Sequence, residues 1–313
     1  MLTDIAAPRR NRKFQRAELP PPLQLTPRDE QIIQRVGEHR FLTSRQIHEL
    51  LGGSEQNILR RLNVLFHAGY LDRPRAQLDY YTATGSSPMV YALGDRGARL
   101  LIQRHGAVLP DREWQRKNRV GRPFIEHTLA IANFHVALIN TTRTQPHIEL
   151  INDKALIAAF PKAPVTLDRA FAWQTTVRRN DSTHKISVKP DYAFALKSPA
   201  NGHRAYLVEC DRATMPISRN NFDQTSIVRK FAGYIAGHAA KLHESTFGWK
   251  AFRVLFITDT PARAANMRTA LHEYTKVANA RRLFFFTHAD TRTSTDLLAL
   301  TWVDGNGQKV SLI

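Results

Sequence analysis

Three carboxylates in the second half of the chain could form an acidic site on two neighbouring strands. Glu209 and Asp211 end an apolar run that begins at Tyr206, and Asp191 opens an earlier strand. Because side chains alternate along a strand, Glu209 and Asp211 share one face, which Asp191 reaches if the two strands pair. Converging carboxylates repel one another unless a hard cation such as Mg²⁺ holds them, and bound Mg²⁺ can activate water for phosphodiester hydrolysis.

The elements that would position these acids follow an α/β pattern. Apolar residues at helical spacing predict helices over about 124–140, 221–243 and 262–279. Strand-like segments are expected near 148–160, 166–178, 185–196, 203–210, 252–258 and 281–287. A helix, then strands, then alternating helices and strands predicts a mixed-sheet α/β domain.

This element order resembles the core of the PD-(D/E)XK nuclease superfamily, with Asp191 at its first acid and Glu209 at its second. The resemblance implies a restriction-endonuclease-like fold in which Glu126, on the first helix, joins Asp191, Glu209 and Asp211 as a metal ligand. The superfamily has a lysine two residues after the second acid, where this chain has Asp211. Lys230 on the following helix is the best substitute, which makes Asp191, Glu209 and Lys230 the candidate catalytic residues.

The N-terminal third has the start and stop signals of three consecutive helices. Thr26, Thr43 and Ser54 are capping residues at three helix starts, and Gln46 completes a capping box with Thr43. Gly52-Gly53 separates the second helix from the third. The spacing of the three helices is typical of a helix-turn-helix.

A β-hairpin is expected after the third helix. Two short strands at about 80–82 and 89–93 lie on either side of a Gly/Pro turn. A further helix over about 95–104 closes the module. Three helices followed by a hairpin is the order of a winged helix-turn-helix.

The third helix could read base edges in a duplex groove. Its apolar positions face a core, and its other positions carry amide and basic side chains, with His67 near its end. Gln and Asn can bond adenine, and Arg can bond guanine. Basic residues on neighbouring elements would position the module on phosphates. The predicted DNA-binding residues are Ser54, Gln56, Asn57, Arg60 and Arg61 on this helix, Arg45 before it, and Arg73 and Arg75 beside the hairpin. The alternative is a winged helix used for protein contacts.

Three motifs together resemble the replication-relaxation family of plasmid and mobile-element proteins. The run Glu209–Thr214 matches a Glu-x-Asp-Arg-x-Thr motif, and Glu126-His127 and Lys189-Pro190-Asp191 also fit. The resemblance covers about residues 27–258. It implies a winged helix joined to a nuclease-like domain, with a role in replication, relaxation or mobilisation of plasmid-like DNA.

The composition favours a nucleic-acid partner. The net charge is +18, and basic residues are in excess in both halves of the chain, which favours salt-dependent attraction to phosphates. No apolar run approaches the roughly 18 residues of a membrane span, and Met1–Arg16 lacks the apolar core of a signal peptide. The single cysteine, Cys210, fits a reducing cytosol. We therefore expect a cytoplasmic protein associated with the nucleoid or a plasmid.

The predicted organisation has four parts. These are a disordered basic arm (1–24), a winged helix-turn-helix domain (25–105), a basic linker (106–122) and a nuclease-like α/β domain (123–313). The expected partner is double-stranded DNA, and a homodimer or other mobile-element replication proteins stay open as further partners.

Three roles remain open for the acidic cluster. It could be an inactive scaffold within a DNA-binding protein, a Mg²⁺-dependent endonuclease or nickase, or structural charge pairing of Asp211 with Arg212 or Lys230. A P-loop ATPase is disfavoured because its phosphate-binding motif is absent from the sequence.

Overall fold

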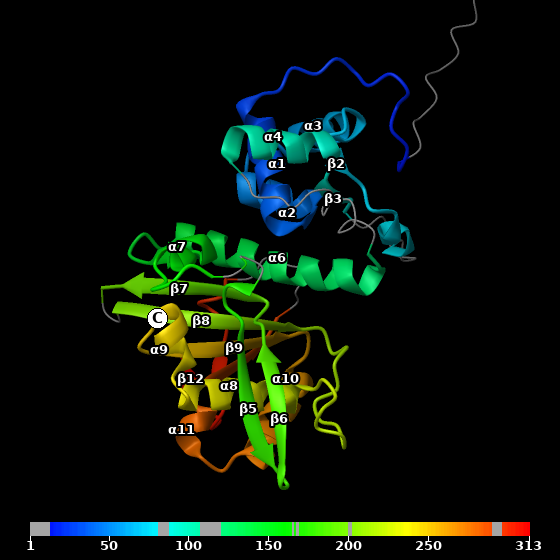
Figure 1. The fold of residues 1–313 in the computed structure, drawn as a ribbon. Helices are drawn as coiled ribbons and strands as arrows, with labels where there is room; N and C mark the ends of the chain where they lie inside the picture. Colours follow the sequence, from blue (N-terminus) through cyan, green and yellow to red (C-terminus); the bar gives the residue numbers. More distant parts are fainter. Residues whose placement is uncertain are drawn as a thin grey trace, which may run out of the picture. The chain divides into compact units, whose positions relative to one another are not determined.

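The computed structural model describes residues 13–80, 88–106, 120–164, 166, 169–199, 202–289 and 296–313. The chain divides into two compact units, Met1–Ala132 and Asn133–Ile313. The first holds a small sheet among helices and the second a seven-stranded mixed sheet, so the protein is mixed α/β as predicted (Figure 1). Among the described residues, no helix has both the length and the apolarity to cross a membrane.

The three predicted helices of the N-terminal unit begin at the predicted capping residues. α1 (Pro27–His39) and α2 (Ser44–Leu51) each start with a capping box, built on Thr26 and Thr43 respectively. In each box the cap side chain and the side chain three residues later bond each other's backbone N–H groups. α3 (Glu55–His67) begins at Ser54, whose hydroxyl accepts a hydrogen bond from Asn57 N. Local capping chemistry therefore sets all three starts.

The sheet of the N-terminal unit differs from the predicted hairpin. Its strands are β1 (Phe41–Thr43), β2 (Leu71–Asp72) and β3 (Val90–Leu93), in the order β1-β3-β2 with antiparallel pairs. The expected strand at 80–82 is not formed at Tyr80, which ends the 3₁₀ helix η1 (Arg75–Tyr80); residues 81 and 82 lie outside the described residues.

A side chain bonds the backbone of β3 in this region. The Gln77 amide donates to Val90 O at 2.9 Å and accepts from Val90 N at 2.8 Å, so the edge of β3 is satisfied where β2 has already ended. α4 (Asp95–His105) follows β3, as predicted.

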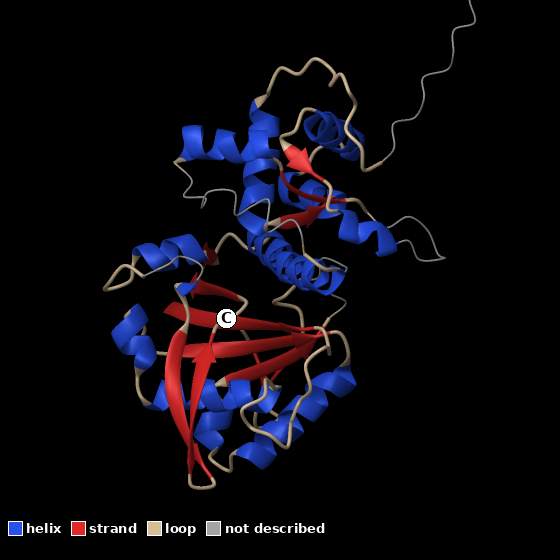
Figure 2. Ribbon diagram, turned by 45° about the vertical axis from the view of Figure 1, so that its right-hand side comes forward, coloured by secondary structure: helices blue, strands red, loops and turns tan. Residues whose placement is uncertain are grey.

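The C-terminal unit is built on a seven-stranded sheet. α6 (Arg122–Arg143) leads into this unit. The strands are β4 (Glu149–Ile151), β7 (Tyr192–Ser198), β8 (Gly202–Asp211), β9 (Phe252–Thr258), β10 (Phe284–His288), β11 (Trp302–Asp304) and β12 (Lys309–Val310). Their order is β12-β11-β10-β9-β8-β7-β4. Figure 2 shows the strands of this sheet in red. Only the β8-β9 and β9-β10 pairs are parallel, so the mixed sheet that the sequence predicts is confirmed.

Several predicted strands have different bounds. The segment 148–160 forms β4 and then a helix, α7 (Asp153–Ala158), whose N-cap Asn152 accepts from Ala155 N at 2.9 Å. The segment 185–196 is two strands, because Lys189–Asp191 interrupts it between β6 (Ser182–Val188) and β7. β6 pairs only with β5 (Trp173–Arg179), in a separate two-stranded hairpin.

The helix predicted over 221–243 also divides in two. α8 (Ile227–Ala239) starts where the hydroxyl of Ser226 accepts from Arg229 N, and Lys241, in a left-handed conformation, separates it from α9 (Leu242–Phe247). The helix predicted over 262–279 is α10 (Pro261–Tyr274), followed by α11 (Ala278–Arg281).

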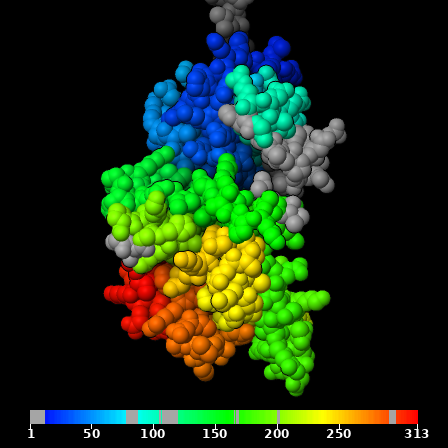
Figure 3. All heavy atoms as spheres, turned by 60° about the vertical axis from the view of Figure 1, so that its left-hand side comes forward, coloured from blue at the N-terminus to red at the C-terminus, as the bar shows by residue number. Residues whose placement is uncertain are grey.

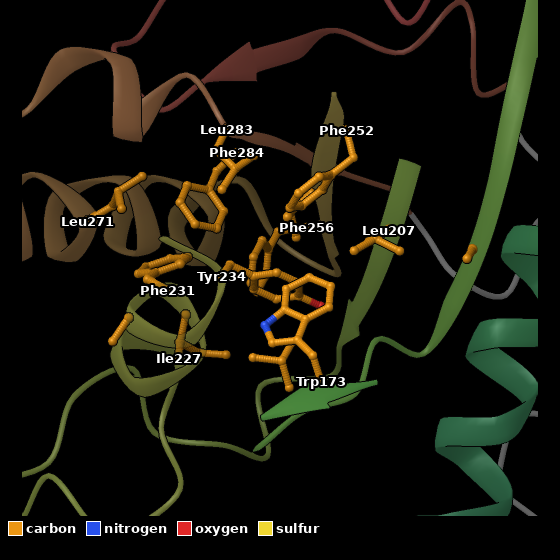
Figure 4. Close-up of a cluster of buried hydrophobic side chains, with 14 of the residues drawn as sticks. Trp173, Leu207, Ile227, Phe231, Tyr234, Phe252, Phe256, Leu271, Leu283 and Phe284 are labelled. Carbon is orange, nitrogen blue, oxygen red and sulfur yellow. The ribbon is translucent and has the colours of Figure 1, made fainter. Parts of the chain in front are cut away.

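The core of the C-terminal unit lies between α8, α10, the β5–β6 hairpin and one face of the sheet. Figure 4 shows Phe231 and Tyr234 of α8 among Trp173, Phe256 and Phe284. Two glycines of α8 let the hairpin approach closely, because a Cβ at Gly233 would lie 2.6 Å from Val188, and one at Gly237 would lie 2.3 Å from the Trp173 ring.

Candidate functional site

The structure brings Asp191 next to Glu209, as the sequence predicts. Antiparallel pairing places Tyr192 opposite Val208, and Asp191 N donates to Val208 O at 2.9 Å. The Asp191 carboxylate then accepts from Cys210 N at 2.8 Å. The first acid is therefore fixed to the backbone of the strand that carries the second.

Lys230 also reaches this site. One helical turn separates Lys230 from Tyr234 on α8, and both side chains point at the Glu209 carboxylate. Lys230 Nζ contacts Glu209 Oε2, and the Tyr234 hydroxyl donates to Oε1 at 2.6 Å. The Glu209 side chain is only 2% exposed, and that of Lys230 is 28% exposed. We call Asp191, Glu209, Lys230 and Tyr234 the acid–lysine site.

Burial and charge act in opposite directions on the pKa values of this site. Burial raises the pKa of Glu209, and the ammonium of Lys230 only partly offsets this. Burial alone would lower the pKa of Lys230, but the carboxylates of Glu209 and Asp191 raise it instead. The pKa of Tyr234 is raised, first by burial and then by Glu209. Lys230 is therefore a firmly held cation, and Tyr234 a neutral donor.

Asp211 has a partner that the sequence does not suggest. Its carboxylate accepts from Arg263 of α10 through two guanidinium nitrogens, at 2.9 and 3.1 Å, and from the Thr258 hydroxyl at 3.3 Å. The hypothesis that Asp211 pairs with Arg212 or Lys230 did not include Arg263. A strand-borne acid followed by a capped helix does not reveal this contact, because it depends on how α10 packs.

The predicted metal ligands are divided between the two units. Glu126 belongs to the N-terminal unit, where its carboxylate accepts from Arg122 Nε at 2.8 Å. In the part of the chain that the structure describes, no three His, Cys, Asp or Glu side chains lie where they could share a metal ion. One Glu209 oxygen accepts from Lys230 and the other from Tyr234, so both oxygens are already held by protein groups. In this arrangement the residues do not fit a Mg²⁺ site.

One face of α3 is exposed and mostly polar. Ile58, Leu62 and Leu65 are buried, whereas the opposite face is exposed to solvent. The exposed residues are Ser54, Glu55, Gln56, Asn57, Leu59, Arg60 and Asn63. Four predicted DNA-binding residues of α3 (Ser54, Gln56, Asn57 and Arg60) therefore lie together on one surface, which we call the α3 face.

Arg61 turns away from that face. Its guanidinium donates to the fully buried Asp29 of α1, with Nε at 2.7 Å from Oδ1. Burial would raise the pKa of Asp29, but hydrogen bonds from Arg61 and Thr26 lower it below the usual value. Arg61 therefore joins α3 to the capping box of α1.

His67 is not a surface residue, contrary to the expectation from helical spacing. Only 7% of it is exposed, and its Nδ1 accepts from Ala17 N at 2.9 Å. Burial, followed by the charges of Arg73 and Arg16, lowers its pKa. Residues near Ala17, within the predicted disordered arm, thus contact the end of α3.

The remaining predicted phosphate-binding arginines have varied surroundings. Arg45 Nε lies 2.8 Å from Glu49 Oε1, and half of the Arg45 side chain stays exposed. Arg75 is exposed on η1. Arg73 lies 4.1 Å from the centre of the Phe66 ring. A cavity of about 810 Å³ in the N-terminal unit is lined by Arg16, Arg73, Arg75, Arg96 and Arg99, together with Asp72 and Asp95. Sequence reasoning missed Arg96 and Arg99, which stand one helical turn apart near the start of α4.

The sequence matches the Replication-relaxation family over residues 33–248, which is more than half of the chain. The matched range contains the α3 face and the whole acid–lysine site. No curated protein and no solved structure matches the chain. The chain therefore belongs to the replication-relaxation family.

Proposed function

We propose that this protein binds duplex DNA through the α3 face and acts in the replication, relaxation or mobilisation of a plasmid or mobile element, or in their regulation. Membership of the replication-relaxation family suggests a plasmid replication-related protein. In this proposal, residues 25–105 are a winged helix-turn-helix, residues 106–122 a basic linker, and residues 123–313 a nuclease-like domain. Ser54, Gln56, Asn57 and Arg60 contact the DNA.

The observation that carries the proposal is the composition of the α3 face. A helix in the major groove needs a buried side that fixes it and an exposed side with hydrogen-bonding groups. Gln56, Asn57 and Arg60 are exposed on α3, and Ile58 and Leu62 hold the other side in the core. Arg61 holds α3 in place by donating to Asp29 of α1, so its role is to position the helix and not to contact bases.

Arginines on neighbouring elements support phosphate contact. Arg45 on α2 and Arg75 on η1 are exposed, and the arginine-lined cavity of the same unit carries five guanidinium groups against two carboxylates. Contacts of this kind give affinity that is independent of sequence and sensitive to salt. Arg45, Arg73 and Arg75 would therefore position the unit without choosing the sequence.

Fluorescence anisotropy with a labelled duplex, in rising salt, tests this proposal. Gln56→Ala and Arg60→Ala should each weaken binding by about 1–3 kcal/mol if the side chains read bases. The matched control is Gln31→Ala with Arg35→Ala, which removes the same residue types from α1. Equal affinity of the α3 variants and the wild type would mean that another surface binds DNA.

Metal-dependent DNA cleavage is the second candidate function. The observation that favours it is the meeting of Asp191, Glu209 and Lys230, the three positions that the nuclease resemblance requires. The bonding of both Glu209 oxygens to Lys230 and Tyr234 favours a non-catalytic role, in which the closed acid–lysine site stabilises the sheet and α8.

Supercoiled plasmid incubated with Mg²⁺ or Mn²⁺ separates the two roles. A closed site predicts intact supercoils with the wild type. Nicking or linearisation that disappears in both Asp191→Asn and Glu209→Gln would establish the nuclease instead. Cleavage that persists in both variants would indicate a contaminating enzyme.

A further inference from the structure

The β5–β6 hairpin of the C-terminal unit is a polar two-stranded ribbon. Its register is regular from Trp173↔Val188 to Arg179↔Ser182, and Asn180 and Asp181 form a two-residue turn with positive φ angles of 47° and 58°. Such angles match the right-handed twist of the two strands. The hairpin extends away from the seven-stranded sheet, with which it shares no strand (Figure 1, Figure 2).

One face of the ribbon is held in the core. Trp173, Ile186 and Val188 are buried and pack against α8, where Gly233 and Gly237 leave room for them. The space-filling view shows the hairpin, in green, at the surface beside the yellow α8–α9 segment (Figure 3). The position of the ribbon is thus fixed by its inner face.

The opposite face carries only polar side chains, all of them exposed. Its three cross-strand pairs are Gln174↔Ser187, Thr176↔Lys185 and Arg178↔Thr183. No side chain of these six makes a hydrogen bond or ion pair with any described residue. The hairpin's one carboxylate, Asp181, lies in the turn. We call these six residues the outer row.

We propose that the outer row is a second contact with duplex DNA, made by inserting the ribbon into a major groove. The inference rests on the proposed function, because it supposes that the protein binds a duplex, and it adds a DNA-contacting element in the C-terminal unit. Lys185 and Arg178 supply charge complementary to phosphates. Gln174 and Arg178 can bond adenine and guanine edges, and the threonine methyl groups can contact thymine.

The dimensions of the ribbon favour a duplex groove. Two strands lie about 4.8 Å apart, and the major groove is about 12 Å wide, so a two-stranded ribbon fits within it. Single-stranded nucleic acid is instead held by stacking on aromatic side chains. The outer row contains no aromatic residue, which argues against a single-strand platform.

The ribbon leads directly to the acid–lysine site. β6 ends at Val188, and Asp191, three residues later, bonds the backbone of β8 beside Glu209. A short segment of the chain therefore connects the outer row to this site.

The salt dependence of duplex binding tests the inference in the full chain. Arg178→Ala with Lys185→Ala should reduce the slope of log K against log salt by about two, since each lost phosphate contact reduces it by about one. The control removes two exposed lysines elsewhere in the same unit, Lys276→Ala with Lys309→Ala, and should leave the slope unchanged.

A thiol-protection measurement tests the contact without relying on affinity. The native Cys210 is buried, so Thr183→Cys places the one exposed thiol of the described residues on the outer row. Saturating duplex should slow its reaction with maleimide at least tenfold. Thr269→Cys, at an exposed position on α10, should react at the same rate with and without duplex.

The outcomes separate the two proposals. If the wild type binds no duplex, both fail. If Arg60→Ala weakens binding but the ribbon variant keeps the wild-type slope and Thr183→Cys is not protected, only the ribbon inference fails. Protection by single strands but not by duplex would also overturn it.

Discussion

Each unit holds a basic helix residue against a buried carboxylate, and the surroundings of the two pairs differ. Arg61 of α3 binds Asp29, which also caps α1. Lys230 of α8 binds Glu209, which has Asp191 rather than a helix cap as its neighbour. The first pair joins two helices beside the α3 face, whereas the second joins two acids and a cation at one point. The two basic residues therefore differ in role, because one carboxylate belongs to a helix cap and the other lies beside a second acid.

The largest predicted effect is the loss of the cation from the acid–lysine site. Lys230→Ala leaves Glu209 buried beside Asp191 without a counter-ion, so the free energy of unfolding of the C-terminal unit should fall by about 3–5 kcal/mol. Urea denaturation followed by tryptophan fluorescence measures this change. Glu209→Gln with Lys230→Met should cost much less, because no uncompensated charge remains. A loss below about 1 kcal/mol for Lys230→Ala would contradict the buried pair.

The corresponding change in the N-terminal unit should be smaller. Arg61→Ala removes one partner of Asp29, but the Thr26 backbone N–H and hydroxyl still donate to that carboxylate at 2.7 Å. We expect a loss of about 1–3 kcal/mol in the unfolding free energy. Arg60→Ala should change stability by less than about 0.5 kcal/mol, because Arg60 is exposed.

Substitution of Arg60 should thus reduce DNA affinity, and substitution of the adjacent Arg61 should reduce stability. Thermal unfolding and duplex titration of the Arg60→Ala and Arg61→Ala variants check this separation. Loss of DNA affinity in a fully folded Arg61→Ala variant, with no loss in Arg60→Ala, would reverse the assignment.

The pH dependence of the two carboxylates should have opposite signs. The pKa of Asp29 is lowered, so its contribution is complete above the unfolded value of about 3.9 and is lost as the pH falls through the folded pKa. The pKa of Glu209 is raised, so protonation favours the folded state and its contribution increases as the pH falls. Calorimetry of Asp29→Asn and Glu209→Gln between pH 7 and pH 3 compares them. An Asp29→Asn variant that loses as much stability in acid as the wild type would contradict the prediction for Asp29.

The smallest predicted effect concerns a buried histidine. His243 is buried, and its ring stacks on that of His238 with the ring centroids 5.0 Å apart. Burial is the main cause of the lowered pKa of His243. Stability should be complete above the unfolded pKa of about 6.5 and should decrease as the pH falls through the lower folded pKa. Urea titrations at pH 7 and pH 5 should show a smaller decrease in His243→Phe. An unchanged decrease would assign the pH effect to other groups.

The comparison also shows how far the sequence could predict this structure. Helix starts at Thr26, Thr43 and Ser54 were predictable because capping depends on residues three positions apart. The order of strands and helices around Asp191 and Glu209 was predictable from hydrophobic periodicity. Lys230 was predicted through a resemblance, and the structure places it at Glu209.

Contacts between distant elements were not predictable in this way. Helical spacing puts Arg60, Arg61 and His67 outside the apolar stripe, but tertiary packing turns Arg61 to Asp29 and buries His67 beside Ala17. The pairing of Asp211 with Arg263 depends on the position of α10. The contact of the Gln77 amide with the Val90 backbone is likewise one that no periodicity encodes.

Photo-crosslinking from the α3 face tests the central claim most directly. With benzoylphenylalanine in place of Asn57, irradiation of the complex should join the protein to bases of the duplex, because this position lies on the exposed face of α3. The same group in place of Gln31, exposed on α1, should give little crosslinking. Efficient crosslinking from position 31 and none from position 57 would contradict DNA binding through α3.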